Sequence, residues 1–261
     1  MNRATLAKLL EQRIAENRRA QDVDLVRWIF ERVTVEKCDQ VLELCCGTGS
    51  QTLRMLSMLG EGGTIHALDL SREALETLVE RASEFRNKLV TLQADLDDLS
   101  GTLKRAELER PQFDVVFCAY GLYYSNDPAR ILNEAFAWLK PSGRIVIVGP
   151  FGPNNAPLFD LVRASGGTIP EPVVTSSEWF MNRTVVPWAA MKFRTTRIST
   201  MVNRVRWATP EHVLNYWQNT TFYSAEHRPE FEERLVRHFA RHPAFINEKW
   251  VMMVEMTDAR S

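Results

Sequence analysis

The chain has 261 residues, of which 45% are hydrophobic and 25% are charged. This length and composition can bury one substantial core, and open α/β folds reach this length as single domains. The formal net charge of -1 creates no overall attraction to a polyanion, so we expect no nucleic acid and no acidic membrane surface as a partner. No stretch stays apolar for long enough to cross a bilayer, and we therefore expect a cytoplasmic protein.

The cysteines and histidines do not have the spacing of a metal site. Cys45 and Cys46 are neighbours, and the four cysteines form neither a secreted disulfide framework nor a paired zinc motif. His238 and His242 have the i, i+4 spacing of one helix face, but no third ligand motif accompanies them. His66 lies inside an apolar run, which is typical of a core histidine. We expect reduced thiols and no bound metal.

Short apolar runs alternate with longer amphipathic runs between residues 38 and 150. This alternation predicts βα units and a mostly parallel sheet. A polar helix over residues 1–19 and an amphipathic helix over 22–33 are expected to precede the sheet. In chain order, the expected elements are then a strand over 40–45, a helix over 48–59, a strand over 64–69, a helix over 71–85 capped by Ser71, strands over 89–94 and 113–119, a helix over 128–139, a turn over 140–143 and a strand over 144–149.

Composition changes after Gly149, where prolines recur and aromatic residues become frequent. The remaining expected elements are helices over 155–163, 210–218 and 229–242, an extended stretch over 194–207 and a last strand over 249–256. The last strand is predicted to return to the sheet. We therefore expect one domain over residues 1–261, with a core of about 20–150 plus 246–258 and a lid insertion after the fifth strand over about 151–245.

A glycine-bearing turn follows the first expected strand and opens the next helix. Gly47 and Gly49 in this turn let a ligand approach bare backbone. Asp69 ends the following strand about 20 residues further on, where ribose hydroxyls are bound in folds of this kind. These features predict a cofactor that contains a nucleoside. A dinucleotide fingerprint would place a third glycine where this chain has Thr52, which disfavours a nicotinamide cofactor.

Four segments in chain order resemble successive motifs of the class I methyltransferases that use S-adenosylmethionine. The segments are Glu43-Leu-Cys-Cys-Gly-Thr-Gly49, Ala67-Leu-Asp-Leu-Ser71, Gln93-Ala-Asp-Leu96 and Leu139-Lys-Pro-Ser-Gly-Arg144. The resemblance covers residues 38–150 well and the later chain poorly. It implies a Rossmann-like methyltransferase fold, S-adenosylmethionine as cofactor and a small-molecule acceptor.

The resemblance also implies a set of cofactor-binding residues. Asp69 would hold both ribose hydroxyls, and Asp95 would accept a hydrogen bond from the adenine amino group. Asp97 and Asp98 stand close to Asp95, so the three acids could instead form a solvated loop; Asp95 is favoured because it directly follows the strand. The implied set is Glu43, Cys45, Gly47, Gly49, Asp69, Leu70, Asp95, Leu96 and Ala119, with the two leucines on either side of the adenine ring.

Two positions in the first motif need their own explanation. Cys45 stands where a glycine is commonest in the family, so the backbone must pass the cofactor with a small side chain attached. Glu43 ends an apolar strand, where an unpaired carboxylate would be costly. It is expected to accept backbone hydrogen bonds, to join a network beside the cofactor, or to have a purely structural role.

The acceptor side of the site is expected in the loop after the fourth strand. By the resemblance, this loop faces the transferable methyl group and brings Tyr120, Tyr123 and Tyr124 near the chemistry. Methyl transfer is an in-line displacement, so the protein's main task is to position two reactants. If a hydroxyl is methylated, we expect its proton to pass to Tyr120, Tyr124 or His212, with His227 as a further candidate base.

Basic and aromatic residues gather in the expected lid. No acidic residue occurs between Glu178 and Glu211, whereas six basic residues do, at positions 183, 192, 194, 197, 204 and 206. This pattern would attract an anionic acceptor, and equally fits a solvent-facing edge strand. The candidate acceptor-binding residues are Arg194, Arg197, Arg204, Arg206, Trp217 and Tyr223, although the aromatic residues could form the lid's own core.

The sequence therefore predicts a methyltransferase that acts on a small molecule, with O-methylation as the leading reaction and an anionic acceptor as an option. Two other functions stay open. One is a catalytically silent, methyltransferase-like subunit that binds the cofactor and a protein partner. The other is an NAD-dependent oxidoreductase.

Overall fold

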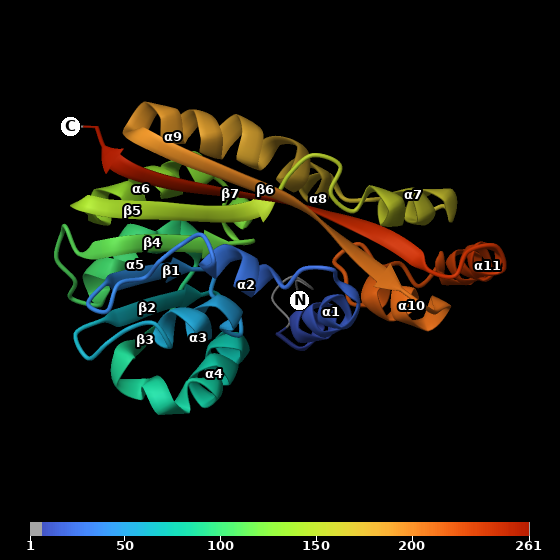
Figure 1. Cartoon of the computed structure of the whole chain (residues 1–261), viewed down its shortest axis with the longest axis horizontal. Coiled ribbons are helices and arrows are strands. Elements are labelled where there is room, and N and C mark those ends of the chain that lie inside the picture. Colours follow the sequence, from blue (N-terminus) through green and yellow to red (C-terminus); the bar gives the residue numbers. More distant parts are fainter. Residues whose placement is uncertain (1–6, 261) are drawn as a thin grey trace.

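The computed structural model describes residues 7–260, so residues 1–6 of the helix expected over 1–19 lie outside the described residues. One sheet has the strand order β3-β2-β1-β4-β5-β7-β6 (Figure 1). Strands β1 to β5 run parallel, and β7 is antiparallel to β5 and β6. This arrangement confirms the predicted Rossmann-like α/β fold. The strands are β1 (Gln40–Leu44), β2 (Thr64–Asp69), β3 (Leu89–Gln93), β4 (Phe113–Ala119), β5 (Leu139–Pro150), β6 (Phe193–Trp207) and β7 (Phe245–Ala259).

The helices begin where the sequence offers capping groups. The Ser71 hydroxyl accepts a hydrogen bond from the Ala74 N–H at 3.2 Å, as predicted for this cap, and Asp127 accepts one from the Arg130 N–H at 2.9 Å. The helices are α1 (Ala7–Ala20), α2 (Leu25–Phe30), α3 (Ser50–Leu56), α4 (Arg72–Arg81), α5 (Leu99–Arg105), α6 (Pro128–Trp138), α7 (Ala156–Ala164), α8 (Glu171–Thr175), α9 (Val186–Lys192), α10 (Pro210–Gln218) and α11 (Arg228–Phe239).

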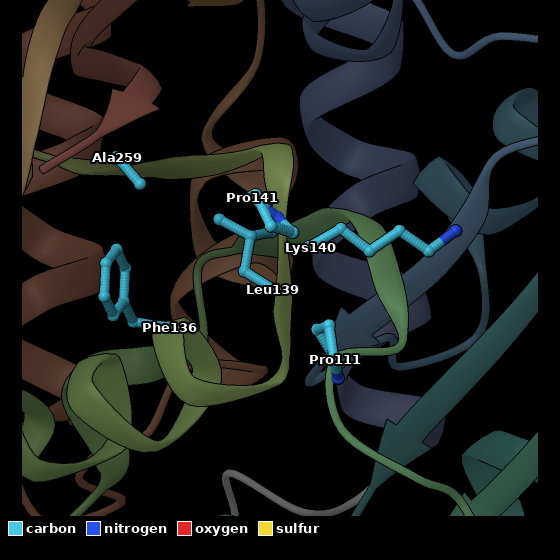
Figure 2. A pocket seen from close by; sticks show the side chains of 6 residues that line it. All are labelled: Pro111, Phe136, Leu139, Lys140, Pro141 and Ala259. Atoms are coloured by element: carbon cyan, nitrogen blue, oxygen red, sulfur yellow. The ribbon is translucent and has the colours of Figure 1, made fainter. Parts of the chain in front are cut away.

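Residues 140–143, predicted as a turn, fall within the bounds of β5 but have no pairing partner on β4. Phe113 pairs with Leu139 and Val115 pairs with Arg144, so a register shift between them absorbs the extra residues as an irregularity. A pocket of about 310 Å³ lies at this amino end of β4 and β5 (Figure 2). Its lining residues are Pro111, Phe136, Leu139, Lys140, Pro141 and Ala259.

A helical run over residues 171–192 is not predicted by the sequence analysis. It consists of α8, a π-helical stretch (Ser176–Val185) and α9. Pro172 lies in the first turn of α8, where a backbone N–H has no intrahelical partner and proline is tolerated. Pro187 lies inside the helical run, at the point where the π-helical stretch ends and α9 begins. Pro172 thus marks a helix start, whereas Pro187 is accommodated where the helix type changes.

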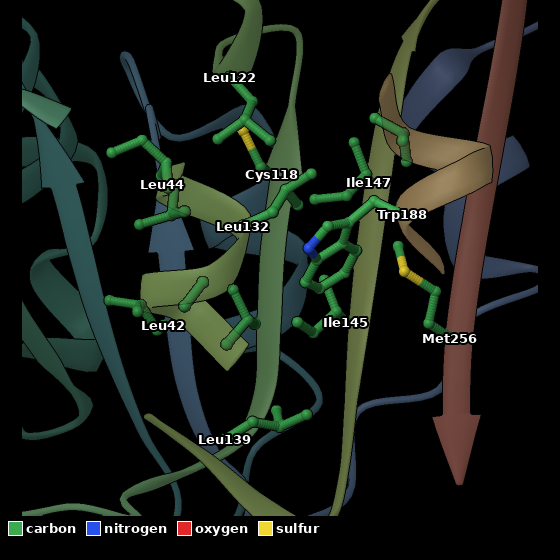
Figure 3. Close-up of a cluster of buried hydrophobic side chains, with 14 of the residues drawn as sticks. Leu42, Leu44, Cys118, Leu122, Leu132, Leu139, Ile145, Ile147, Trp188 and Met256 are labelled. Carbon is green, nitrogen blue, oxygen red and sulfur yellow. The ribbon is translucent and has the colours of Figure 1, made fainter. Parts of the chain in front are cut away.

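Helices cover both faces of the sheet and bury two apolar clusters. Helices α5, α6 and residues 180–189 cover one face, where Trp188 lies among side chains of β4, β5 and β7 (Figure 3). Helices α2, α3 and α4 cover the other face. Strand β7 alternates between the faces, because Met252 and Val254 join the first cluster while Val251 and Met253 join the second.

The β6–β7 hairpin is longer than the rest of the sheet. Its strands pair from Phe193 with Ala259 to Trp207 with Phe245, whereas β5 reaches along β7 only as far as Val251. The far end of the hairpin thus projects past the carboxyl ends of the parallel strands (Figure 1). A third apolar cluster there packs α7, α10 and α11 onto the hairpin. The segment expected as a lid therefore also supplies the edge strand β6.

The chain after α1 is fastened to the edge strand by Asn203. The buried Asn203 side chain accepts a hydrogen bond from the Val23 N–H at 3.0 Å and donates one to the Val23 carbonyl at 2.7 Å. Gln21 forms an isolated bridge with Val205. These contacts hold α1 between the carboxyl ends of the sheet and α10 (Figure 1).

Replacing Asn203 with Ala is expected to lower the free energy of unfolding by about 2 kcal/mol, because two backbone groups of Val23 lose their partners. Trypsin should then cleave after Arg18 and Arg19 faster than in the wild type, since α1 is released. Urea unfolding and timed digestion measure the two effects. Thr200→Ala, at an exposed position of β6, should change neither; equal cleavage of both variants would show that other contacts hold α1.

Candidate functional site

The carboxyl ends of β1 and β4 form the switch point of the sheet. Strand β1 is followed outward by β2 and β3, whereas β4 is followed by β5 on the other side. Open α/β sheets bind ligands in the crevice at such a point. Cys45 follows β1 with φ 57°, and Tyr120 follows β4 with φ 60°. Left-handed backbone at residues other than glycine is uncommon and clusters at functional sites.

Asp69 ends β2 and holds the loop that follows β1. Its Oδ2 accepts a hydrogen bond from the Gly47 N–H at 2.8 Å, and its Oδ1 accepts one from the Ser71 N–H at 2.9 Å. An ionised carboxylate has about four lone-pair sites, so each oxygen keeps the capacity to accept from one ribose hydroxyl. The geometry fits the predicted ribose contact and adds a structural role that the sequence analysis does not identify.

The two glycines of the loop differ in what surrounds them. Both have positive φ, 54° at Gly47 and 84° at Gly49. A Cβ at Gly49 would lie 2.2 Å from the Cδ1 of Leu78 in α4, so a side chain at this position would displace that buried leucine. A Cβ at Gly47 would meet Leu10 of α1 at 3.3 Å. The side of the loop at Gly47 therefore faces α1, which covers it.

The three acids after β3 have separate roles in the structure. Asp95 is exposed and accepts a hydrogen bond from the Asp97 N–H at 2.9 Å, which caps a short 3₁₀ turn (Leu96–Asp98). Asp98 pairs with Arg105. The groups that lower the pKa of Asp97 are Ser125, Asn126 and Arg130. Asp97 and Asp98 thus interact with other side chains of the protein. Asp95 is exposed to solvent, two residues after the end of β3.

The leucines predicted to enclose the adenine ring differ in exposure. Leu70, directly after β2, is 51% exposed, and Leu96 is buried. An exposed large apolar side chain at the carboxyl edge of a sheet is a ready contact for a flat apolar ring. Leu70 therefore has the exposure that one wall of an adenine site requires.

Glu43 is buried in β1, next to the loop that contains Gly47 and Gly49. Burial raises its pKa to about 8, the Thr52 hydroxyl acts in the opposite direction, and the charge of Asp69 adds to the rise. Its Oε2 has no hydrogen-bond partner within residues 7–260, so the expected backbone amides do not satisfy this oxygen. Glu43 is mainly protonated in the folded chain at neutral pH.

Cys45 and Gly121 fit one another across the switch point. A Cβ at Gly121 would lie 2.1 Å from the Cys45 Cβ and 2.5 Å from its Sγ. The sequence analysis misses this pair, because 75 intervening residues separate the loop after β1 from the loop after β4. Gly121 therefore provides the space that the Cys45 side chain occupies.

The predicted catalytic residues lie at different depths. Tyr120 follows Ala119 at the end of β4, and burial raises its pKa well above the ordinary value. Tyr124 is 59% exposed, and its ring lies tilted against that of Tyr123 at a centroid distance of 4.7 Å. His212 lies in α10, with its Nδ1 3.2 Å from a carboxylate oxygen of Glu16 in α1. The structure thus brings Tyr120 to the site's edge, leaves Tyr124 outside and places His212 against α1.

The four arginines predicted to bind the acceptor are exposed on the edge strand β6. Three of them pair with acids on neighbouring segments: Arg197 with Glu255 at 3.3 Å, Arg204 with Glu248 at 3.4 Å and Arg206 with Asp22 at 3.2 Å. The acids missing from the local sequence are thus supplied mainly by β7. The structure does not gather Arg194, Arg197, Arg204 and Arg206 around the switch point, and their contacts fit the edge-strand alternative.

The predicted aromatic wall belongs to the third apolar cluster. Trp217 is fully buried and stacks on Phe231 at a ring distance of 4.0 Å. Tyr223 meets the edge of Trp217 at 5.0 Å. These contacts fit the alternative that the aromatic residues form the lid's own core.

Other candidate groups lie away from the switch point. His66 is buried in β2 beside Phe113, and burial lowers its pKa. His238 lies beside His242 in the region of α11. Within the described chain, no three His, Cys, Asp or Glu side chains are arranged to hold a metal ion. Between residues 7 and 260, no helix combines the length and apolar character needed to span a bilayer.

A family model described as a methyltransferase domain matches residues 41–143. The chain is 34% identical over 108 residues to a demethylmenaquinone methyltransferase from Lactococcus lactis subsp. lactis (strain IL1403), covering 41% of this chain and 40% of that protein. It is 29% identical over 153 residues to a 2-phytyl-1,4-naphtoquinone methyltransferase from Trichormus variabilis, covering 58% and 57%. The chain spans about half the length of these curated relatives.

Solved structures share the fold over most of the chain. The YcgJ protein from Bacillus subtilis superposes with a TM-score of 0.62 at 12% identity, covering 90% of this chain and 98% of that chain. A putative methyltransferase from Bacillus halodurans gives a TM-score of 0.60 at 10% identity, covering 90% and 99%. The fold thus extends beyond residues 41–143, the part that the family model matches.

Asp69→Ala is expected to weaken S-adenosylmethionine binding by about 1 to 3 kcal/mol, because the acceptors for the ribose hydroxyls are lost. Loss of the Gly47 and Ser71 hydrogen bonds should also lower the melting temperature. Asp95→Ala should weaken binding less, since it removes one adenine contact. Titration calorimetry and thermal unfolding separate the effects. Unchanged affinity in a folded Asp69→Ala protein would mean that the ribose is bound elsewhere.

Gly121→Ala is expected to destabilise the protein by about 1 to 3 kcal/mol, because its Cβ would overlap Cys45. Adding Cys45→Gly should restore much of the loss, and thermal unfolding of both single variants and the double variant measures the coupling. The control is Gly62→Ala, whose Cβ would meet only the side chain of the exposed Cys38. Purely additive effects at residues 45 and 121 would disprove the steric coupling.

Proposed function

We propose that this chain is a class I methyltransferase that transfers a methyl group from S-adenosylmethionine to a small-molecule acceptor. The observation that carries the proposal is the Asp69 carboxylate, which is fixed by two backbone amides and faces the switch point beside the exposed Leu70. A nucleoside bound there would direct the rest of the cofactor toward Gly47 and the end of β4. The chain would act as one domain, with the far end of the hairpin and its helices above the acceptor.

The names of the relatives support a quinone-related aromatic acceptor in its reduced, hydroxyl-bearing form. A reduced ring is required on chemical grounds, since the methyl group is electrophilic and needs an electron-rich oxygen or carbon. We favour transfer to oxygen, because the only catalytic group that this reaction needs from the protein is one that accepts the hydroxyl proton. An anionic acceptor is the second option, and the pairing of Arg197, Arg204 and Arg206 with acids weighs against it.

The residues at the switch point would hold the donor as follows. Asp69 would accept from the ribose hydroxyls, Asp95 from the adenine amino group, and Leu70 would contact the adenine ring. When bound, the cofactor supplies a sulfonium methyl group that is open to in-line attack. Helix α1 covers Gly47 and would exclude water from the reacting groups, so that binding and orientation supply most of the rate enhancement.

The proposal is tested by methyl-donor turnover against a panel of reduced naphthoquinones, phenols and acidic metabolites, scored by mass gain. A reduced naphthoquinone should gain one methyl group, and Asp69→Ala should lose most of this activity. S-adenosylmethionine should raise the melting temperature, whereas NAD should not. Stabilisation by NAD instead would favour an oxidoreductase. Stabilisation by S-adenosylmethionine without turnover on any panel member would favour a silent cofactor-binding subunit.

A further inference from the structure

The far end of the β6–β7 hairpin contains a polar contact in largely apolar surroundings. The Lys249 ammonium donates a hydrogen bond to the Tyr216 hydroxyl and lies 4.4 Å from the centre of its ring. Tyr216 is buried, and Lys249 is half-buried. Removing an ammonium group from water costs free energy that one hydrogen bond to a neutral phenol does not fully offset. The contact is therefore a candidate for a functional role.

Strand β7 directs Lys249 toward the proposed active site. Val251 pairs with Pro150, the last residue of β5, so Lys249 lies just beyond the carboxyl ends of the parallel strands. Side chains alternate along a strand, which puts Lys249 on the same face as Val251. Val251 belongs to the apolar cluster against which Tyr120 packs. Lys249 and Tyr120 therefore lie on the same face of the sheet, near its carboxyl edge.

Helix α1 adds two further polar side chains at the same place. Asn17 donates a hydrogen bond to Tyr216. The positive charge of Arg13 acts to lower the pKa of both Tyr216 and Tyr123. The Nε of Arg13 and the Oδ1 of Asn17 are buried and have no hydrogen-bond partner among residues 7–260. Buried polar atoms in native proteins normally have partners. A bound hydroxyl-bearing molecule would supply them.

The surroundings of Tyr216 favour its ionised form. Burial acts to raise its pKa, but the charges of Lys249 and Arg13 and the hydrogen bonds from Lys249 and Asn17 together outweigh burial, so the pKa is lowered. The pKa of Tyr120, at the end of β4, is shifted in the opposite direction, because burial raises it. Of these two hydroxyls, Tyr216 is therefore the one suited to receive a proton.

We propose that Tyr216 is the general base that takes the proton of the acceptor's hydroxyl group, with Lys249 stabilising the phenolate and Asn17 and Arg13 orienting the acceptor. The inference rests on the proposed function and names a catalytic residue within it. The acceptor's O–H proton moves to the Tyr216 oxygen, and the freed oxygen lone pair forms a bond to the methyl carbon. The carbon–sulfur bond breaks, its electron pair stays on sulfur, and the neutral thioether leaves. Tyr216 then returns its proton to water.

Enzyme turnover tests the proposal with dithionite-reduced 1,4-naphthoquinone as the acceptor. Tyr216→Phe, which keeps the ring, should lower kcat at neutral pH by about 100-fold without changing the dissociation constant of S-adenosylmethionine. In the wild type, kcat should rise with pH and level off as Tyr216 ionises. In Tyr216→Phe it should keep rising with hydroxide concentration, because no base of the protein remains. A purely structural role would lower the melting temperature and leave the shape of the pH profile unchanged.

The second variant is Lys249→Met, with Lys192→Met as its matched control because Lys192 also lies over an aromatic ring, that of Phe136 at 5.6 Å. Lys249→Met should move the plateau of the pH profile to higher pH, since the phenolate loses its cation. Lys192→Met should leave the profile unchanged. If Lys249→Met and Lys192→Met have the same profile as the wild type, the proposed role of Lys249 is wrong.

An acceptor-independent measurement separates this inference from the proposed function. The ultraviolet absorbance of tyrosinate should show one tyrosine of the wild type that ionises below the ordinary tyrosine range. That transition should be absent from Tyr216→Phe and shifted upward in Lys249→Met. If the transition is present but the wild type methylates nothing, the proposed function fails while Tyr216 keeps its ionisation. If the transition is absent, or if Tyr216→Phe retains wild-type turnover and pH profile, the inference is overturned.

Discussion

The Asp69 carboxylate connects the parts of the sheet on which the candidate site depends. By accepting from the amides of Gly47 and Ser71, it joins the loop after β1 to the start of α4 across the ends of two strands. Without this contact, the positive φ values at Cys45 and Gly47 would have no side-chain support from β2. The residue that would bind the cofactor's ribose therefore also shapes the loop that would receive the rest of the cofactor.

The second half of the site depends on the unequal length of the strands. Because the β6–β7 hairpin continues past β5, it supports α10 and places Lys249 above the carboxyl edge. Asn203 pairs with Lys249 in the hairpin register and fastens the chain that follows α1. One edge of the sheet thus positions both α1 and α10, the two helices that face the end of β4.

Local patterns in the sequence predict the regular part of this fold well. The strands over 64–69 and 113–119 and the helix over 210–218 occur with the predicted bounds, because apolar periodicity and capping residues specify them locally. The helical run over 171–192 is missed, since proline at a helix start and proline within a helix look alike in sequence. The segment over 140–143, predicted as a turn, instead forms an irregular part of β5, which depends on the non-local register between β4 and β5.

Only those parts of the site that lie within continuous sequence motifs could be predicted. Asp69 and the glycine loop are recognisable from spacing, but the fit between Cys45 and Gly121 and the contact between Tyr216 and Lys249 join residues far apart in the chain. The prediction that the arginines of β6 bind an anionic acceptor has a related weakness. Their partners lie on the neighbouring strand and at Asp22, so a local surplus of positive charge says little about the net charge in space.

Burial of Glu43 makes the stability of the folded chain depend on pH. An unfolded glutamate ionises near a pKa of about 4.3, whereas the folded value is about 8. Between these values the folded chain carries one proton more at Glu43 than the unfolded chain, so this group's contribution to stability falls as pH rises through that interval and is largest below it. Folding in neutral solution therefore takes up a proton at Glu43, and this uptake is lost as the solution becomes alkaline and Glu43 ionises in the folded chain.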